Sequence, residues 1–218
     1  MDPLAETARS TLVRRPQRGR RDRETVNAIL DEALVCHVGF VDGSQPVVTP
    51  TSHWRVGDWL YFHGAPRSRL MLHLASGAPV CVSVALVDGL VLARSAFRHS
   101  VDYRSVMLFG SGEAVETAEE KRAAFAVLID KMSPGRSALV RPPDDGEVAA
   151  TAVARLAIAE GSAKVRSEPP SEADKDRSWT PWTGTIPVAV RAGAPIPAAP
   201  GAGAPPPLWP WLGGGSGI

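Results

Sequence analysis

The spacing of apolar positions changes several times along the chain, and each change marks an expected element. Between residues 23 and 33 the apolar side chains recur at helical spacing, and Asp22 before them is of a type that caps helices. Between 34 and 63 they follow strand spacing, interrupted by turn-forming sequences at 42–43 and 55–58. We expect a short helix followed by an antiparallel meander of three strands.

The rest of the chain alternates between helix and strand patterns. The expected elements are a helix over 66–77, strands over 80–87, 90–97 and 103–116, helices over 118–131 and 147–156, and strands over 156–166 and 186–190. A turn at Asp88-Gly89 separates two strands, and Gly110 and Gly112 are expected to mark a bend where the sheet closes. Thr117 and Glu120 have the spacing of a capping box. This order predicts a mainly β fold with inserted helices, arranged as a small β-barrel.

The two ends of the chain differ in composition from a body spanning residues 23–192. Residues 1–22 are rich in Arg, and because no aromatic residues interleave the charges we expect a solvated extension rather than a nucleic-acid or membrane-surface arm. Residues 193–218 hold seven Gly, seven Pro and no charged residue, which predicts a flexible tail. The apolar stretch at 208–212 is the exception, since it could dock onto a partner or onto the body itself.

Composition argues against several classes of function. The chain has 24 Lys and Arg against 23 Asp and Glu, a net charge of +1 that is unlike a dedicated nucleic-acid binder. No apolar stretch reaches the roughly 18 residues of a membrane span, so we expect a cytoplasmic protein. Cys36 and Cys81 lie in apolar runs and are expected to be buried thiols. The five His residues lack the spacing of metal ligands, so we expect no metal site.

One stretch of the chain carries a chemical signal. A strand is expected to end at His63, and after a Gly-Ala-Pro turn Arg67, Ser68 and Arg69 open the next helix. Two guanidiniums and a hydroxyl at one point make an anion site. The alternative is a pair of solvated arginines in a turn.

A second candidate is the stretch from Trp179 to Pro187. Two Trp side chains beside Gly184 can cover a flat ligand, or they can seal one end of the barrel. The usual catalytic motifs, such as G-x-S-x-G, H-E-x-x-H and G-x-G-x-x-G, are missing from the sequence. Binding chemistry therefore carries the functional argument.

Four stretches taken in order resemble a known family. They are Val47–Pro50, Tyr61–Arg69, Arg104–Glu113 and Trp182–Pro187. Together they resemble the pyridoxamine 5′-phosphate oxidase-like split β-barrel family, whose members bind flavin nucleotides. Within it, the nitroimidazole-resistance (Nim)-like flavoproteins are the most similar branch. The resemblance covers about residues 23–191, and the order and spacing of all four stretches carry it.

The resemblance implies roles for particular residues. Those expected to contact the flavin ring and its ribityl chain are Val47, Val48, Thr49, Pro50, Phe62, His63, Ser105 and Trp182. Those expected to clamp the flavin phosphate are Arg67, Ser68 and Arg69, in agreement with the anion site above. Family members are usually homodimers with two FMN molecules at the subunit interface, so FMN and a second copy of the chain are the implied partners.

One departure from the family narrows the function. The true oxidase carries an Arg-x-His-x-Arg signature after its late Trp, and residues 185–191 lack it, so oxidation of pyridoxamine phosphate is not expected. His63 stands where Nim-like proteins hold a histidine near the flavin. Its imidazole could exchange a proton during hydride transfer, or it could only form a hydrogen bond at the strand end.

The sequence therefore favours an FMN-binding oxidoreductase acting on a small molecule, with NAD(P)H or the deazaflavin F420 as reductant. The flavin would carry the electrons, and the protein would anchor and orient it. The alternatives left open are FAD or F420 in place of FMN, a flavin carrier or sensor without turnover, a haem-binding split barrel, and a scaffold that docks a partner through the chain ends.

Overall fold

The computed structural model describes residues 2–199, 203–209 and 212. The α-helices are α1 (Arg23–Glu32), α2 (Arg69–Ala75), α3 (Ala118–Met132) and α4 (Asp145–Ala150), and single 3₁₀ turns lie at Pro16–Arg18, Ala96–Arg98, Arg136–Ala138 and Asp174–Asp176. The strands are β1 (Gly19–Arg20), β2 (Val35–Asp42), β3 (Gln45–Ser52), β4 (Trp54–Val56), β5 (Trp59–Gly64), β6 (Pro79–Leu92), β7 (Ser100–Ala114), β8 (Ala152–Ala157), β9 (Glu160–Arg166) and β10 (Gly184–Pro187).

The strands form one antiparallel sheet that bends around β7. Their order is β3-β2-β6-β7-β8-β5-β4, with β9 beside β7 and β10 beside β6. β7 pairs with β9 up to Phe109 and with β8 from Gly112 onward, so it passes from one half of the sheet to the other between them. The bend predicted from Gly110 and Gly112 is therefore confirmed. The mainly β fold of the split-barrel type is confirmed as well.

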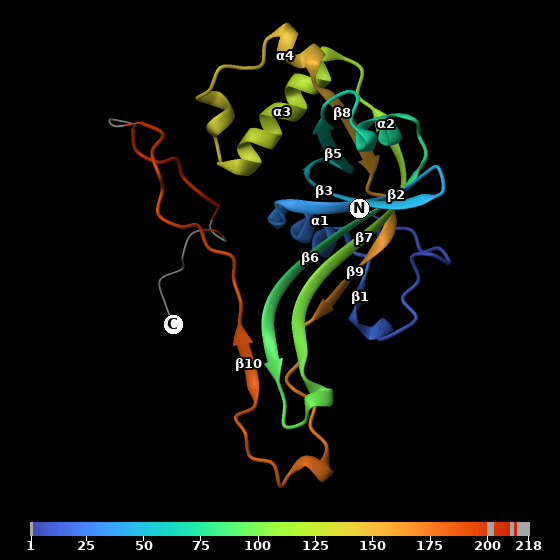
Figure 1. The fold of residues 1–218 in the computed structure, drawn as a ribbon, viewed down its shortest axis with the longest axis vertical. Coiled ribbons are helices and arrows are strands. Elements are labelled where there is room, and N and C mark those ends of the chain that lie inside the picture. The colour runs from blue at the N-terminus through green and yellow to red at the C-terminus, as the bar shows by residue number, and fades with distance from the viewer. Residues whose placement is uncertain (1, 200–202, 210–211, 213–218) are drawn as a thin grey trace.

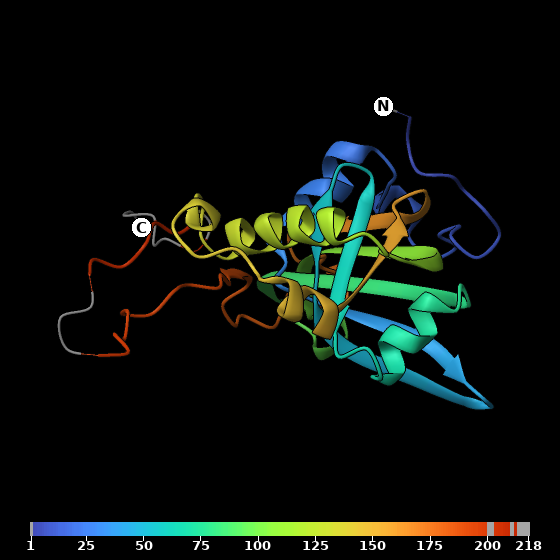
Figure 2. The ribbon, with the colours of Figure 1, turned by 90° about the horizontal axis from the view of Figure 1, so that it is seen from above.

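Two apolar clusters hold the sheet and helices together. The barrel interior contains fully buried side chains from β2, β5, β6, β7, β8 and β9, which include Leu60, Phe62, Val82, Leu108 and Leu156. A second cluster lies between β5 and α3, which crosses the outside of the barrel in Figure 2. Each fully buried apolar side chain contributes about 1.5–3 kcal/mol to folding, so the barrel interior is the main source of stability.

Helix caps follow the sequence closely, with one exception. Asp22 accepts a hydrogen bond from Thr25 N at 2.8 Å and begins α1 as predicted. Thr117 caps α3, but the capping box expected from Glu120 does not form. The Glu120 carboxylate instead accepts hydrogen bonds from Tyr61 Oη at 2.8 Å and Arg155 Nη1 at 2.6 Å. A charge-assisted bond to a guanidinium outweighs a bond to one backbone amide.

The turn predicted at Asp88-Gly89 is wrong. β6 runs continuously through these residues, and its pairing with β7 shifts register between Val87 and Gly89. The Asp88 carboxylate accepts two hydrogen bonds from Arg104 on β7, at 2.8 and 2.9 Å. The dipeptide therefore forms a bulge in a long strand, because its acidic side chain has a partner on the neighbouring strand.

Two further expectations about elements are wrong. The predicted helix over 147–156 stops at Ala150, and the following residues form β8, which pairs with β5 through residues such as Val153 and His63. The predicted three-stranded meander is a β2–β3 hairpin and a separate β4–β5 hairpin. Strand partners that are distant in sequence decided both cases, and these outweigh local propensity.

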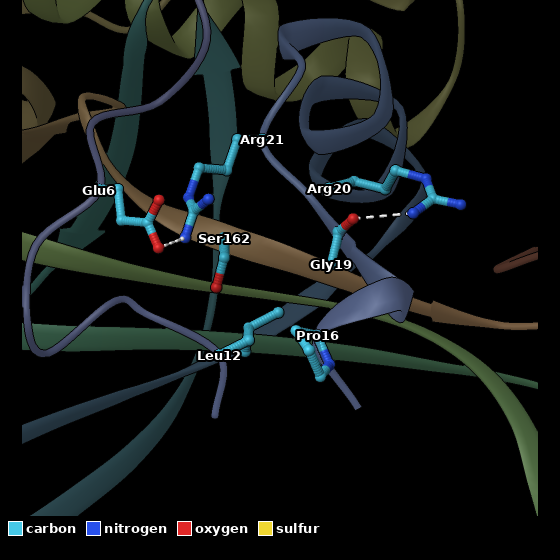
Figure 3. A pocket seen from close by; sticks show the side chains of 7 residues that line it. All are labelled: Glu6, Leu12, Pro16, Gly19, Arg20, Arg21 and Ser162. Atoms are coloured by element: carbon cyan, nitrogen blue, oxygen red, sulfur yellow. Dashed lines mark hydrogen bonds and ion pairs between the residues drawn. The ribbon is translucent and has the colours of Figure 1, made fainter. Parts of the chain in front are cut away.

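The N-terminal residues pack on the barrel, so the expectation of a solvated extension is wrong. Leu4 is buried in the main core, and β1 pairs with β9. Arg9 forms an ion pair with Glu160 at 2.6 Å. Figure 3 shows Arg21 reaching Glu6, also at 2.6 Å, above Ser162 in a small pocket of about 170 Å³. Arg9 and Arg21 thus form ion pairs within the molecule.

The distal ends of β6 and β7 form an arm that projects from the barrel, with β10 alongside β6 (Figure 1). The C-terminal residues then return toward α3, where Trp209 Nε1 donates a hydrogen bond to Lys131 O. Pro210 and Trp211 of the predicted apolar stretch lie outside the described residues. Among the described helices, none has both the length and the apolar character needed to cross a bilayer.

Candidate functional site

The predicted phosphate clamp lies at the connection between β5 and α2. Ser68 caps α2, and its hydroxyl accepts a hydrogen bond from Met71 N at 3.4 Å. Arg67 is exposed, and Arg69 forms a loose ion pair with Asp42 at 3.3 Å in which both side chains stay more than half exposed. Two accessible guanidiniums beside a hydroxyl are a donor set that fits a phosphate group.

Gly64 makes this connection tight. A Cβ at this position would lie 3.0 Å from Met71 Cγ and 3.5 Å from Ser68 Oγ. The absence of a side chain therefore lets α2 begin directly beside the end of β5. The Asp42 contact also brings the clamp next to the β2–β3 hairpin, which Figure 2 shows beside α2.

A shallow apolar hollow of about 620 Å³ lies beside the clamp. Its main lining residues are Phe40, Val41, Val47, Val48, His73, Val80, Cys81 and Phe109. His73 stacks on Phe40, with ring centroids 4.5 Å apart, and Arg9 lies over the Phe109 ring at 5.2 Å. Arg69 and His73 are four residues apart on α2 and share one face of the helix. The hollow and the clamp are therefore adjacent.

β3 contributes three consecutive residues to this hollow, Pro46, Val47 and Val48. It is an edge strand of the sheet, since β2 is its paired neighbour. Val47 is half-buried against the core, whereas Val48 is 66% exposed. Thr49 is half-buried and Pro50 is exposed further along the strand. The structure thus brings Val47 and Val48 together with the clamp, and places Thr49 and Pro50 on the same open edge.

Phe62 and His63 point to opposite sides of β5. Phe62 is fully buried in the barrel interior and has no open face toward a ligand. His63 packs under α3 between Trp54 and Phe125, with ring centroids 5.6 and 6.2 Å away. Burial lowers the pKa of His63, and its Nδ1 is buried without a hydrogen-bond partner among the described residues. The imidazole is therefore neutral near pH 7.

The last two predicted residues lie away from the clamp. The Ser105 hydroxyl, on β7, donates to Lys164 O at 3.4 Å. Trp182 precedes β10, which pairs with the far end of the 14-residue strand β6, whereas α2 precedes the near end. A strand of that length spans roughly 40 Å. Within one chain, Trp182 therefore does not reach the clamp.

A second cavity, of about 490 Å³, lies between the body and the segment that follows β10. Its apolar wall is formed by Leu34, Val35, Leu86, Val87, Val188 and Val190. The exposed His37 on β2 also lines it. Arg104 is at the base, where it bonds Glu32 and Asp88, so its charge is already neutralised. The cavity thus offers one imidazole on an apolar wall.

Sequence reasoning missed His37 and the residues that complete the shallow hollow. The alternation along β2 places His37 on the outer face, which was a usable signal. The four-residue spacing of Arg69 and His73 was another. Nothing local indicated Phe40 or Phe109, because the hollow forms only when β2, β7 and α2 meet.

Comparison with known proteins places the chain in a family. The sequence model of pyridoxamine 5′-phosphate oxidase matches residues 22–165. The chain belongs to this family. No curated protein matches the chain in sequence. The predicted family is therefore confirmed, although the substrate signature of the true oxidase is missing from residues 185–191.

Two solved structures have a fold similar to that of this chain and match most of its length. The flavocytochrome Anf3 from Azotobacter vinelandii is 38% identical, with 96% of this chain and 97% of that chain covered and a TM-score of 0.84. The FAD and haem binding protein from Mycobacterium smegmatis is also 38% identical, with 89% and 95% covered and a TM-score of 0.80.

A third structure is described as a 5-nitroimidazole antibiotic resistance protein from Bacteroides thetaiotaomicron. It is 25% identical, with 67% of this chain and 86% of that chain covered, and its TM-score is 0.57. The chain is thus similar to a Nim-like protein, as predicted. The two proteins named for flavin and haem are more similar to the chain in sequence, and they also match more of its length.

Proposed function

We propose that this protein binds a flavin nucleotide in the shallow hollow and uses it in oxidation–reduction of a small molecule. The observation that carries the proposal is the apolar hollow of Val47, Val48 and His73, with the accessible guanidinium of Arg69 one helical turn before His73 on α2. Arg67, Ser68 and Arg69 would hold the phosphate. A bound flavin supplies hydride and electron transfer, and the chain anchors and orients it.

The identity of the flavin is a finer question. The resemblance favours FMN, with FAD and F420 as alternatives. FAD gains support because the Mycobacterium smegmatis protein, 38% identical, is named for FAD. NAD(P)H or reduced F420 is the proposed reductant. The predicted proton exchange by His63 is not part of this proposal, because its imidazole packs under α3 against Trp54 and Phe125 and does not line the hollow.

Haem is the second proposed cofactor. Both relatives that are 38% identical carry flavin and haem chemistry in their names. The chemistry of the second cavity fits such a group, because apolar walls suit the porphyrin and His37 offers an imidazole for the iron. His37 would hold the haem iron. The chain would then hold two redox groups, as a flavocytochrome does.

We also propose a homodimer with the flavin at the subunit interface. Several apolar side chains on the projecting arm are exposed in the single chain, including Val87, Leu90, Val101 and Ile186. Soluble proteins rarely leave large apolar patches uncovered. A second subunit would cover them, and its own Trp182 and Ser105 could then approach a flavin that they do not reach within one chain.

The test is the cofactor content and redox behaviour of the purified full chain. We expect a flavin absorption spectrum together with a Soret band, and release of FAD on denaturation. His37→Ala should remove the Soret band and leave the flavin in place, whereas His99→Ala, on an exposed turn, should change neither.

Three results would contradict parts of this proposal. A chain that stays colourless after incubation with FMN, FAD and F420 would exclude flavin binding. A Soret band that survives His37→Ala would exclude that residue as the ligand. A bound flavin that neither NAD(P)H nor reduced F420 bleaches would favour a carrier or sensor over an enzyme.

A further inference from the structure

The C-terminal residues return to the body and make specific contacts with the end of α3. Trp209 Nε1 donates a hydrogen bond to Lys131 O at 2.8 Å. The Ser133 hydroxyl donates to Pro207 O at 2.9 Å. The last carbonyls of a helix lack partners within the helix, so the indole supplies a donor that α3 needs. The Trp209 side chain is therefore held by a directional hydrogen bond as well as by contacts of its apolar surface.

Trp209 lies over a cavity of about 470 Å³ between α1 and α3. Trp54 and Lys131 also line this cavity, with Asp31 and Asp130 at its edge. Asp31 is paired with Arg55 at 2.5 Å, and Asp130 accepts hydrogen bonds from Ser137 N and Oγ. Glu32, the third acidic residue that lines the cavity, is paired with Arg104 at 2.5 Å. Each of these three carboxylates thus has a partner other than Lys131.

Lys131 has no carboxylate partner among the described residues. Its Nζ donates to Leu30 O at 2.9 Å and lies 3.4 Å from Nε2 of the buried His53. Burial lowers the pKa of Lys131 to about 8, and the nearby Arg55 acts in the same direction, while Asp31 and Cys36 oppose it. The lowered pKa of this amine depends on the exclusion of water from its surroundings.

We propose that residues 207–209 form a strap that closes the α1–α3 cavity and controls access to the Lys131 amine. Among the described residues, the Trp209 Nε1–Lys131 O and Ser133 Oγ–Pro207 O hydrogen bonds hold the strap to the end of α3. The segment that leads to the strap is uncharged and rich in Pro and Gly. With so few contacts the strap can open without unfolding the body. Trp209 lines the cavity together with Lys131, so opening of the strap would widen access to the amine.

The test is competitive acylation of the chain's four lysines with trace acetic anhydride between about pH 7 and pH 11, read by peptide mapping. In the full chain we expect Lys131 to reach a low plateau rate relative to the exposed Lys175, with a midpoint near its lowered pKa of about 8. In Trp209→Ala the plateau should rise several-fold and the midpoint should move up toward 10.5 as the amine becomes hydrated.

Matched variants separate a strap from a general loss of packing. Phe97→Ala removes an exposed aromatic side chain elsewhere and should leave Lys131 unchanged. Trp209→Phe keeps a ring but loses the Nε1 bond, and should fall between the full chain and Trp209→Ala. If Trp209→Ala also alters Lys121 and Lys164, the body has been disturbed, and Ser133→Ala then supplies the test in the same direction.

An unchanged plateau and midpoint for Lys131 in Trp209→Ala would overturn the proposal. In the disturbed case, the same result in Ser133→Ala would overturn it. Because the strap comes from the same chain, protection of Lys131 should not depend on protein concentration. Loss of protection on dilution would also overturn the proposal, since it would assign the strap to a neighbouring chain.

Discussion

His53 gives this protein an acid-sensitive point at a single buried residue. The side chain is 1% exposed, and its Nε2 lies 2.9 Å from Leu30 O. Burial and the charge of Lys131 lower the pKa of His53 to about 4. In the unfolded chain the imidazole takes up a proton near its ordinary pKa of 6.5. The unfolded state therefore binds more protons between these two values, and it is stabilised relative to the folded state as the pH falls through this range.

We predict that the contribution of His53 to stability is complete above pH 6.5 and is lost as the pH falls toward about 4. The expected loss is up to about 3 kcal/mol. Urea unfolding at several pH values measures it. His53→Gln, which keeps a hydrogen-bond donor without titrating, should flatten the profile. His99→Gln, at an exposed position, should not.

Arg69 is the residue on which the proposed flavin site depends most directly. Its guanidinium is accessible at the edge of the hollow and is held only by a loose contact with Asp42. We predict that Arg69→Ala weakens flavin binding by about 1–3 kcal/mol, the contribution of a charge-assisted hydrogen bond. Titration calorimetry with the apoprotein gives the value. Arg136→Ala, an exposed arginine beyond α3, is the control, and equal affinities would place the phosphate elsewhere.

The grouping of Arg67, Ser68 and Arg69 was predictable because the three residues are consecutive in the chain, while their role in holding a phosphate stays a prediction. Contiguous residues stay together in any fold, so their chemistry can be inferred from sequence alone. Phe62 and His63 show the limit of that reasoning. Strand alternation separates them onto opposite faces, and only the positions of the barrel interior and α3 decide what each face meets.

At the scale of elements, β7 and α2 approach each other through Gly112. A Cβ on this residue would lie 2.6 Å from Leu74 O and 2.8 Å from Leu74 Cα. We predict that Gly112→Ala destabilises the protein by about 1–3 kcal/mol, because the backbone of α2 must shift. Chemical denaturation measures the change. Gly193→Ala, where a Cβ meets nothing within 4 Å, should be neutral, and similar values for both would contradict the close approach.

Elements defined by local signals were predictable, and those defined by distant partners were not. The helices at α1 and α3 begin at the predicted caps, Asp22 and Thr117. The Asp88-Gly89 pair has the composition of a turn, but Arg104 on β7 holds Asp88 within a continuous strand. Likewise, an Ala-rich segment became β8 because β5 had an open edge for it.

At the scale of the whole molecule, the arm should join two subunits. Leu90 on the arm is 44% exposed in the single chain. We predict that Leu90→Asp converts a dimer into monomers, because burying an unpaired carboxylate at an interface costs several kcal/mol. Light scattering after size exclusion gives the mass. Leu139→Asp, on an exposed leucine away from the arm, should leave the dimer intact, and a dimer that survives Leu90→Asp would move the interface elsewhere.

The ends of the chain were the least predictable part of the molecule. Composition alone made the N-terminal arginines look solvated, yet Arg9 and Arg18 each pair with an acidic residue of the body. Local patterns say nothing about partners that lie far along the chain. The Arg9–Glu160 pair, for instance, joins residues 151 positions apart.

The pairing of β1 with β9 also determines when the molecule can finish folding. β1 leaves the ribosome well before its partner strand β9, because most of the described chain lies between them. Pairing over such a sequence distance is slow because a long loop must be closed. β1 therefore stays unpaired until translation passes Arg166. Pairing of β1 with β9 should be the last step in the folding of this barrel.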